Sequence, residues 1–223
     1  MLIRGAELTL IRAVIVGIDH WEDLTLPFSI QMSEQNTFLG DMFIVDNASN
    51  TSYPKAEYIL RLETRAGYGS ALNHGAAWGK RIWDWLLCCN NDCLCNGNVT
   101  DIIATLRDDT IYGNKWKFDY DGFTDGLPAV VDSAYFLIPR RVWEKIGGFD
   151  PKMEAAFEEI DYCIRALEAG FRLDVAPLPI VHLNMHTRTE TPDYWKRWEE
   201  TRQYFHSKHP ARKDHGHPAE SDR

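Results

Sequence analysis

The segment LLCCNND (residues 86–92) is a short apolar run that ends in two asparagines and an aspartate. An apolar run of this length, bounded by turn residues, is typical of a strand that is buried on both faces of a sheet. The residues Asn90, Asn91 and Asp92 would then lie at the carboxyl end of that strand. A turn that simply ends the strand explains the asparagines, but packing explains the acid poorly. Asp92 is therefore our first candidate functional residue.

The same pattern, an apolar strand followed by an aspartate, occurs twice earlier in the chain. Residues 13–18 (AVIVGI) precede Asp19, and residues 42–45 (MFIV) precede Asp46. Helical segments separate these strands, and this β-α-β order predicts an α/β domain with a largely parallel sheet. Because ligands bind outside the carboxyl ends of the strands in such sheets, we expect Asp19, Asp46 and Asp92 to converge on one site.

The rest of the chain continues the alternation of strands and helices. Apolar periodicity and capping residues predict further strands at 56–62, 130–139, 173–176 and 179–182, and helices after Pro27 and at 70–83, 140–146, 154–169 and 193–205. Ser70 is the expected N-cap of the second helix. The stretch 110–128 shows neither period, so we expect a mobile loop beside the site. Its aromatic residues Trp116, Phe118 and Tyr120 either stack on a bound ligand or form the core of the loop.

The composition bounds what the chain can do. With 223 residues, 44% of them hydrophobic, we expect a single domain over residues 1–205 and a disordered polar tail over 206–223. The formal net charge of -9 argues against general nucleic-acid binding, which needs clustered Lys and Arg. No apolar run approaches the roughly 20 residues of a membrane span, and the charged start does not resemble a signal peptide. Five unevenly spaced cysteines favour a reducing cytoplasm, with peripheral membrane attachment left open.

Four of the cysteines lie close together, and a zinc site is the alternative to a core strand there. Cys88 and Cys89 are adjacent on the predicted strand, so their side chains point to opposite faces. Cys93 and Cys95 could share a face, but two thiolates do not complete a tetrahedral structural zinc site. Because cysteine is also a common small core residue, we expect these side chains to form walls of the core.

The glycine-rich segment GYGSALNHG (residues 67–75) does not match a dinucleotide-binding fingerprint. Leu72 stands where the third glycine or alanine belongs, and the segment follows the wrong strand. No P-loop sequence is present either. A helix N-terminus with glycines can still accept a diphosphate through its backbone N–H groups.

Acidic residues and histidines in the second half of the chain are further candidates. Glu158 and Asp161 share one face of a predicted helix, where they either favour the helix dipole or supply a general base. His182 and His186 follow a strand, where one histidine is a plausible metal ligand but a two-histidine zinc site is not supported. We expect the remaining four histidines of this region to lie in the solvated tail: His206, His209, His215 and His217.

Taken in order, these segments resemble the GT-A glycosyltransferases of family 2, especially the rhamnosyltransferase-like members, over about residues 13–182. FIVDNASNT looks like the strand-end segment of that family, whose aspartate contacts the nucleotide and maps to Asp46. GYGSALNHGAAWGK resembles the glycine-rich segment and helix that follow, with the usual asparagine and glycine at Asn73 and Gly75. LLCCNND is similar to the LNND form of the DxD motif, whose final aspartate, here Asp92, binds the divalent metal.

Two later segments extend the resemblance. IGGFDPKMEAAFEEIDYCIR resembles the block that places the acceptor-side base, and Glu159 aligns with the catalytic aspartate of the family. PIVH is similar to the strand that ends in a histidine near the metal, here His182. The chain departs from the family pattern at residues 17–19, where the family has Thr-Tyr-Asn, at Asn90 in the first position of DxD, and at Glu159 itself.

The resemblance implies a single GT-A domain, Rossmann-like, with a mostly parallel sheet flanked by helices. It implies metal-dependent, inverting transfer of a hexose or deoxyhexose from a UDP- or dTDP-linked donor to a hydroxyl acceptor such as a saccharide, with Mn²⁺ or Mg²⁺ as cofactor. The implied metal ligands are Asp92 and His182, and the implied base is Glu159 or its neighbours Glu158 and Asp161. The implied contacts to the nucleotide sugar are Gly17, Asp19, Asp46, Arg65, Gly67, Asn73 and Asn91.

Three other functions stay open at this point. A sugar-1-phosphate nucleotidyltransferase would carry a glycine-rich, basic loop after the first strand, where this chain has DHWED (residues 19–23). A glycoside hydrolase needs paired carboxylates but no nucleotide site. A non-catalytic module of the same fold would bind nucleotide sugars without transfer. The donor, the acceptor and the oligomeric state also stay open, although the acidic charge disfavours a nucleobase in DNA as the acceptor.

Overall fold

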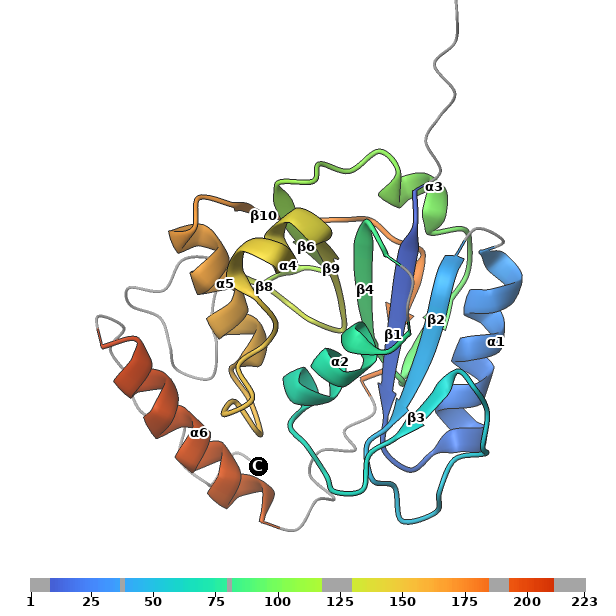
Figure 1. Ribbon diagram of the computed structural model, residues 1–223, viewed down its shortest axis with the longest axis horizontal. Helices are drawn as coiled ribbons and strands as arrows, with labels where there is room; N and C mark the ends of the chain where they lie inside the picture. The colour runs from blue at the N-terminus through green and yellow to red at the C-terminus, as the bar shows by residue number, and fades with distance from the viewer. Residues whose placement is uncertain (1–8, 37–38, 80–81, 118–129, 185–192, 211–223) are drawn as a thin grey trace, which may run out of the picture.

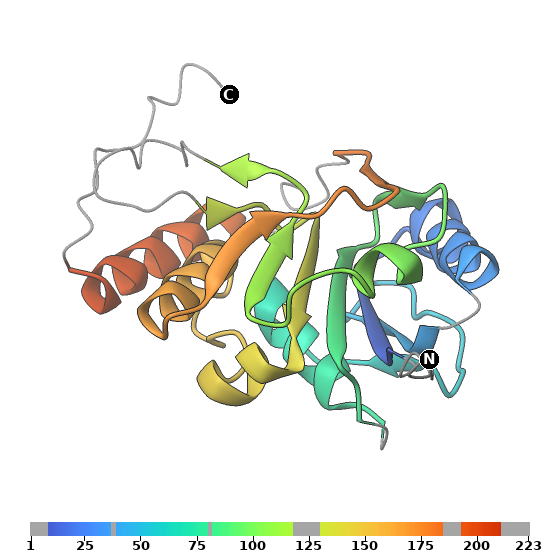
Figure 2. The ribbon, with the colours of Figure 1, turned by 90° about the horizontal axis from the view of Figure 1, so that it is seen from above.

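The protein is built around one seven-stranded sheet with helices on both faces (Figures 1 and 2). The computed structural model describes residues 9–36, 39–79, 82–117, 130–184 and 193–210. The strand order is β10-β6-β9-β4-β1-β2-β3, with β1 at Ile11–Gly17, β2 at Leu39–Asp46, β3 at Ile59–Arg61, β4 at Trp85–Asn90, β6 at Thr110–Gly113, β9 at Tyr135–Pro139 and β10 at Arg172–Val175. Of these described strands, only β9 runs antiparallel to its neighbours. The predicted mostly parallel α/β sheet is confirmed.

Two layers of helices cover the sheet. One face carries α2 (Tyr68–Ala77), α4 (Arg140–Ile146) and α5 (Glu158–Glu168), and α6 (Tyr194–Lys208) packs on the outside of α5. The other face carries the π-helical turn η1 (Trp21–Thr25), α1 (Leu26–Gln35) and the short α3 (Thr100–Ile103). Each layer closes its own hydrophobic core against the sheet.

Strand β1 lies near the centre of the sheet, and all of its residues are buried. Val14 packs into the core below α2 and α5, whereas Ile15 packs into the core below α1. Burial on both faces explains why the strand reads as a continuous apolar run. Helix α2 passes so close to β1 that a Cβ at Gly75 would lie 2.3 Å from Cγ1 of Val14.

Two small antiparallel ribbons extend the structure beyond the main sheet. After β4 the chain turns through Asn91 and Asp92 into β5 (Cys93–Cys95), which pairs with β11 (Ile180–His182). A second ribbon joins β7 (Trp116–Lys117) to β8 (Val130–Val131).

The stretch 110–128 differs from the expected loop. Thr110–Gly113 forms strand β6, which is buried between β9 and β10, and Trp116–Lys117 forms β7. A strand of four residues is too short to show a period in the sequence, and its hydrogen-bonded neighbours define it instead. The expected aromatic residues Phe118 and Tyr120 lie outside the described residues.

Helix α2 starts earlier and ends sooner than the sequence suggests. Its N-cap is Gly67 rather than Ser70, and no side chain caps it. The helix ends before Trp78, which has an extended backbone, and Gly79 then adopts a positive φ of 83°. The positive φ costs glycine little, since glycine has no Cβ.

The last helix extends into the segment that was expected to be a disordered tail. Helix α6 runs to Lys208, so His206 is helical, and His209 is buried. The expectation of disorder was therefore wrong for these residues. His209 pairs with Asp161, which lies 48 positions earlier in the chain, and a contact of this kind leaves no mark on the local sequence. Residues 211–223, with His215 and His217, lie outside the described residues, as does His186.

The cysteines are side chains of the core. All five are buried and outside any disulfide, and burial raises the pKa of the Cys88, Cys89 and Cys93 thiols. Cys88 belongs to the core below α2 and Cys89 to the core on the other face, as strand alternation predicts. In the described ranges no helix is long and apolar enough to cross a membrane.

Candidate functional site

A cavity of about 410 Å³ opens at the carboxyl end of the parallel strands. Its lining comes from the turn after β4, the segment before α2, the start of α5, the end of β11 and the start of α6. Six of the residues predicted to be catalytic, metal-binding or in contact with the nucleotide sugar line it, namely Arg65, Asn91, Asp92, Glu158, Glu159 and His182. This position, outside the carboxyl ends of the strands, is where open α/β sheets bind ligands.

The turn after β4 and the end of β11 bring Asp92 and His182 together. The Oδ1 atom of Asp92 lies 3.1 Å from Nε2 of His182. The antiparallel pairing of β5 with β11 sets this distance, since His182 lies opposite Cys93 and the Leu183 N–H donates to the Asp92 carbonyl. The amide nitrogen of Asn90 lies 3.4 Å from the same histidine nitrogen.

This pair fits a small divalent cation. Two neighbouring ligands of an octahedral ion with bonds of about 2.0–2.1 Å are separated by about 3 Å, and the Asp92 and His182 atoms are 3.1 Å apart. In the described part of the chain, no group of three or more His, Cys, Asp or Glu residues could hold a metal. A Mg²⁺-type ion needs only one or two carboxylates from the protein when substrate phosphates supply further oxygens. A site with two protein ligands therefore suits a metal that binds together with a phosphorylated substrate.

Asn91 is held in the cavity wall by a chain of hydrogen bonds. Its amide donates to Oγ1 of Thr25 at 3.1 Å, and this oxygen lies 2.9 Å from the Tyr53 hydroxyl. The Tyr53 hydroxyl in turn donates to the Asp19 carbonyl, and burial is the main cause that raises the pKa of Tyr53 to about 12. The phenol therefore stays protonated, and the turn after β4 is tied to the end of β1.

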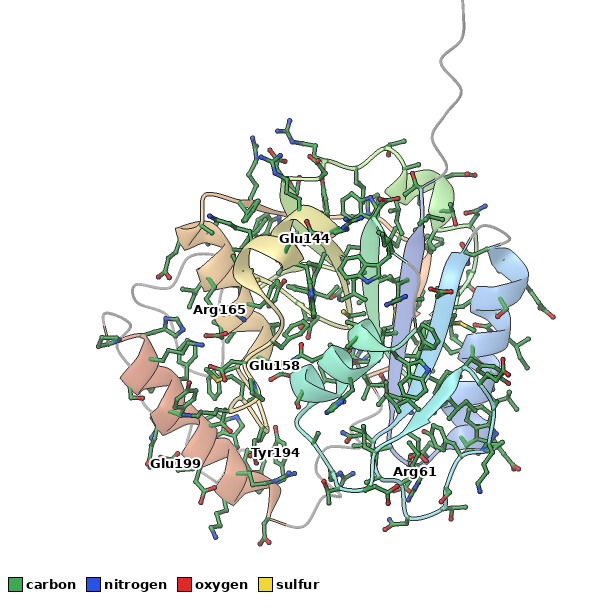
Figure 3. The ribbon with its side chains drawn as sticks, viewed as in Figure 1. Arg61, Glu144, Glu158, Arg165, Tyr194 and Glu199 are labelled. Carbon is green, nitrogen blue, oxygen red and sulfur yellow. The ribbon has the colours of Figure 1, made fainter. Side chains whose placement is uncertain are left out.

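The start of α5 turns two carboxylates toward the cavity. Glu158 and Glu159 both line it, and they follow Phe157, which has a left-handed backbone with φ 70°. In Figure 3, Glu158 on α5 and Tyr194 on α6 lie on the sides of these helices that are turned toward α2. A carboxylate that can reach a bound hydroxyl group is the requirement for a general base.

Asp161 does not reach the cavity, although the sequence placed it on the same face as Glu158. Its carboxylate is fully buried and pairs with Nε of Arg165 at 2.7 Å, Nζ of Lys208 at 2.7 Å and Nε2 of His209 at 3.0 Å. Burial alone would raise the pKa of Asp161, but the charge of Arg165 and the hydrogen bonds from Lys208, His209 and Arg165 outweigh burial and lower the pKa. The position does not fit a general base. It fits a structural ion pair that docks the end of α6 on α5.

Asp46 is also engaged by the protein itself. Its buried carboxylate accepts hydrogen bonds from the backbone N–H groups of Ser49 and Tyr53 and from Arg61. Burial raises its pKa, but the bonds from Ser49, Tyr53 and Arg61 together lower it. Asp46 does not line the cavity, so the expected contact to a nucleotide is not supported. The residue shapes the loop that follows β2.

Asp19 closes the same region from the end of β1. It lies in the left-handed region with φ 51°, its N–H donates to Oγ of Ser49, and its carboxylate accepts two bonds from Asn50. Asn47, which the sequence did not single out, lines the cavity and exchanges hydrogen bonds in both directions with the backbone of Ala66. These bonds attach the segment before α2 to the end of β2.

The remaining expected nucleotide contacts shape the site without lining it. A Cβ at Gly17 would lie 2.4 Å from the Tyr53 hydroxyl, and one at Gly67 would lie 2.7 Å from Cα of Glu154. The side-chain amide of Asn73 donates to the Phe149 carbonyl and accepts from the Phe149 N–H. Glycine is needed at the first two positions because other segments pack against their backbone, and Asn73 fastens the loop before α5 to α2.

Besides Asn47, the cavity is lined by other residues that carried no functional signal in the sequence. Lys115 lines the cavity and pairs with Asp132 at 3.6 Å, while Tyr68 and Arg197 line it from the starts of α2 and α6. Lys115 does lie in the stretch that was expected beside the site. Nothing in the local pattern of α6 distinguishes Arg197 from the other basic residues of that helix, because its inward position depends on how α6 docks on α5.

No family model and no curated protein sequence matches the chain. Among solved structures, GalNAc-T7 with UDP, GalNAc and Mn²⁺ matches 92% of this chain at 15% identity with a TM-score of 0.67, and the chain spans 51% of its length. The catalytic domain of Drosophila beta1,4galactosyltransferase 7 with xylobiose matches 96% of the chain and 84% of its own length, at 14% identity and a TM-score of 0.53. The mannosyltransferase PcManGT of Pyrobaculum calidifontis, with GDP-Man and Mn²⁺, matches 75% of the chain and 54% of its own length, at 12% identity and a TM-score of 0.55.

At sequence identities of 12–15%, these similarities establish the fold and nothing further. The chain adopts the GT-A type of α/β fold that the three glycosyltransferases share.

Proposed function

We propose that the chain is a metal-dependent glycosyltransferase that transfers a sugar from a nucleoside diphosphate sugar to a hydroxyl group of a saccharide. The observation that carries this proposal is the 3.1 Å pairing of Asp92 with His182 in a cavity that Glu158 and Glu159 also line. One part of the cavity suits a metal and phosphates, and another offers a base for a hydroxyl group. The structural relatives solved with UDP or GDP-Man and Mn²⁺ support the same reading.

Asp92 and His182 would hold the divalent cation, Mn²⁺ or Mg²⁺. When bound there, such an ion offsets the charge that develops on the departing diphosphate. Asn91 stands beside this pair and is fixed through Thr25, so its amide is preorganised to orient the ligand rather than adjusting as the ligand binds.

Glu159 is the base in this proposal, and Glu158 is the alternative one residue away. The carboxylate takes the proton of the acceptor hydroxyl while the hydroxyl oxygen forms its bond to C1 of the sugar. The bond from C1 to the diphosphate oxygen breaks with its electron pair on the diphosphate. This single displacement inverts the anomeric centre. It is the outcome that the resemblance to family 2 and its rhamnosyltransferase-like members implies, and we retain a UDP- or dTDP-linked hexose or deoxyhexose as the proposed donor.

Of the residues that we expected to contact the nucleotide sugar, Arg65 and Asn91 line the cavity. We propose that these two residues bind the donor. Buried thiols outside disulfides support a reducing compartment such as the cytoplasm as the place of the reaction.

The proposal is tested by thermal unfolding of the full chain with UDP, dTDP, GDP and ADP, each with Mn²⁺ and with EDTA. We expect one or more nucleotides to raise the midpoint more with Mn²⁺ than with EDTA, and the matching nucleotide sugar to release its nucleoside diphosphate when a saccharide is added. Binding that is unaffected by EDTA would contradict the metal role. Metal-dependent binding with no release on any saccharide would favour a non-catalytic module.

A further inference from the structure

Two arginines from distant parts of the chain line the cavity. Arg65 follows β3, and Arg197 is in the first turns of α6. Lys115, the third cation of the lining, has a carboxylate partner in Asp132. Within the described residues, neither arginine has such a partner at ion-pair distance. The cavity therefore holds two positive charges that the described chain does not neutralise by contact.

The two guanidinium groups also act on one another. Burial lowers the pKa of Arg65, the charge of Arg197 lowers it further, and Asp19 compensates in part. Like charges that interact in a partly buried site are unfavourable for the empty protein, because the low local dielectric strengthens their repulsion. An anion that contacts both would remove that repulsion.

Buried polar atoms in the same lining point to a ligand. The Nε atom of Arg197 and the hydroxyl of Tyr68 are buried, and neither meets a hydrogen-bond partner among the described residues. Polar atoms that are buried in this way are rare in folded proteins, since they lose their bonds to water. A guanidinium Nε only donates and a phenol hydroxyl can donate, so one acceptor group can provide the missing partner of both.

The backbone positions of both arginines are fixed by contacts with other segments. The backbone next to Arg65 is fixed by the two hydrogen bonds between Asn47 and Ala66. Helix α6, which carries Arg197, is docked by the pairing of Lys208 and His209 with Asp161 and by the ring contact of Trp198 with Phe157 at 5.5 Å. These contacts fix the two backbone positions, which limits how far the two guanidinium groups can move apart and favours a preorganised anion site.

We infer that Arg65 and Arg197 form an anion subsite that takes a phosphate-type group and works without the divalent cation at Asp92 and His182. Guanidinium groups suit this ligand, because their N–H groups match phosphate oxygens in pairs. The group could be the diphosphate of the donor or a phosphate on the acceptor. That choice of source rests on the proposed function, whereas the subsite itself does not.

The subsite is tested with inorganic pyrophosphate as the probe, in EDTA, by calorimetry on the full chain. We expect binding that weakens with ionic strength. Arg65→Gln and Arg197→Gln should each lower the affinity roughly tenfold or more. Lys196→Gln, next to Arg197 on the exposed side of α6, should bind pyrophosphate as the unchanged protein does. Asp92→Asn removes a negative charge from the same cavity, so it should bind pyrophosphate at least as tightly.

Two results would overturn the inference. One is the absence of pyrophosphate binding in EDTA, and the other is unchanged affinity in both arginine variants. Circular dichroism checks that each variant is folded, and if Arg197→Gln does not fold, Arg65→Gln decides. Because Asp92→Asn removes metal-dependent binding and spares the arginines, failure of the proposed function and failure of the subsite give different patterns.

The source of the anion follows from two comparisons. If the subsite binds the diphosphate of the donor, Arg65→Gln and Arg197→Gln should weaken binding of a nucleoside diphosphate but not of the nucleoside. If the subsite binds a phosphate on the acceptor, the same two variants should weaken binding of glucose 6-phosphate but not of glucose. This comparison is made with UDP and Mn²⁺ present.

Discussion

The carboxylate of Asp92 lies 3.1 Å from the imidazole of His182, although the two residues are 90 positions apart in the chain. The pairing of β5 with β11 joins them, so the backbone sets the distance before any ligand binds. A pair that is positioned by paired strands loses little conformational entropy when it binds a metal.

Asp92→Asn keeps the size of the side chain and removes its charge. We expect the variant to fold and to lose the Mn²⁺-dependent rise in midpoint with nucleotides, since a neutral amide is a poor ligand for a hard cation. Thermal unfolding with Mn²⁺ or EDTA measures this, and Asp101→Asn on the exposed side of α3 is the matched control. Mn²⁺ dependence that survives in Asp92→Asn would move the metal elsewhere.

Glu159→Gln should slow sugar transfer by roughly 10²–10⁴-fold with little change in donor affinity, the effect of losing a general base. Glu159→Asp should keep part of the activity, and Glu168→Gln at the far end of α5 is the control. Steady-state kinetics and donor binding separate the two effects. If Glu158→Gln abolishes transfer while Glu159→Gln remains active, the base is Glu158.

Asp46→Asn should act on stability rather than on donor affinity alone. The folded-state pKa of Asp46 is lowered, so its stabilisation is present above the unfolded pKa of about 3.9 and is lost as pH falls through the lower folded pKa. We expect a loss of about 2–5 kcal/mol near pH 7 and a weaker acid dependence of the unfolding free energy below pH 4. Urea unfolding from pH 2.5 to 7 measures both. A variant as stable as the unchanged protein with weak donor binding would restore the nucleotide role.

Asp161→Asn should loosen α6 without removing the base. Losing the charge leaves Arg165 without its buried counter-ion and Lys208 with Asp150 as its remaining carboxylate partner, which costs about 3 kcal/mol. Denaturant unfolding should detect this cost, while transfer assayed well below the midpoint should stay within about tenfold of the unchanged rate, an allowance for a small shift of Arg197. A loss of turnover as large as that of Glu159→Gln, in a folded variant, would return Asp161 to the catalytic set.

Tyr68→Phe removes a buried hydroxyl that has no partner among the described residues. We expect stability to stay the same or rise by up to about 1 kcal/mol, because no hydrogen bond within the described chain is lost. Pyrophosphate affinity should fall if the hydroxyl donates to the bound anion, and calorimetry in EDTA tests this. A large drop in the unfolding free energy would mean that the hydroxyl is bonded within the protein.

The sequence by itself determined the central strands of the sheet and the edge at which the site forms. Strands β1, β2 and β4 are continuous apolar runs because both of their faces are buried, and their parallel order brings the residues after them to one edge. Asp92, His182 and the two glutamates of α5 could therefore be assigned to the site from local pattern and resemblance, and they do line one cavity.

Only the tertiary structure decided which polar residues face that cavity and which hold the protein together. We expected Asp46 and Asn73 to contact the nucleotide sugar and Asp161 to be a possible base, but backbone groups and cations from other segments already pair with these side chains. Arg197 and Tyr68 carried no local signal, yet the docking of α6 and α2 turns them into the cavity. Strand period and turn chemistry are properties of neighbouring residues, whereas the partner of a buried polar group comes from wherever the chain packs against it.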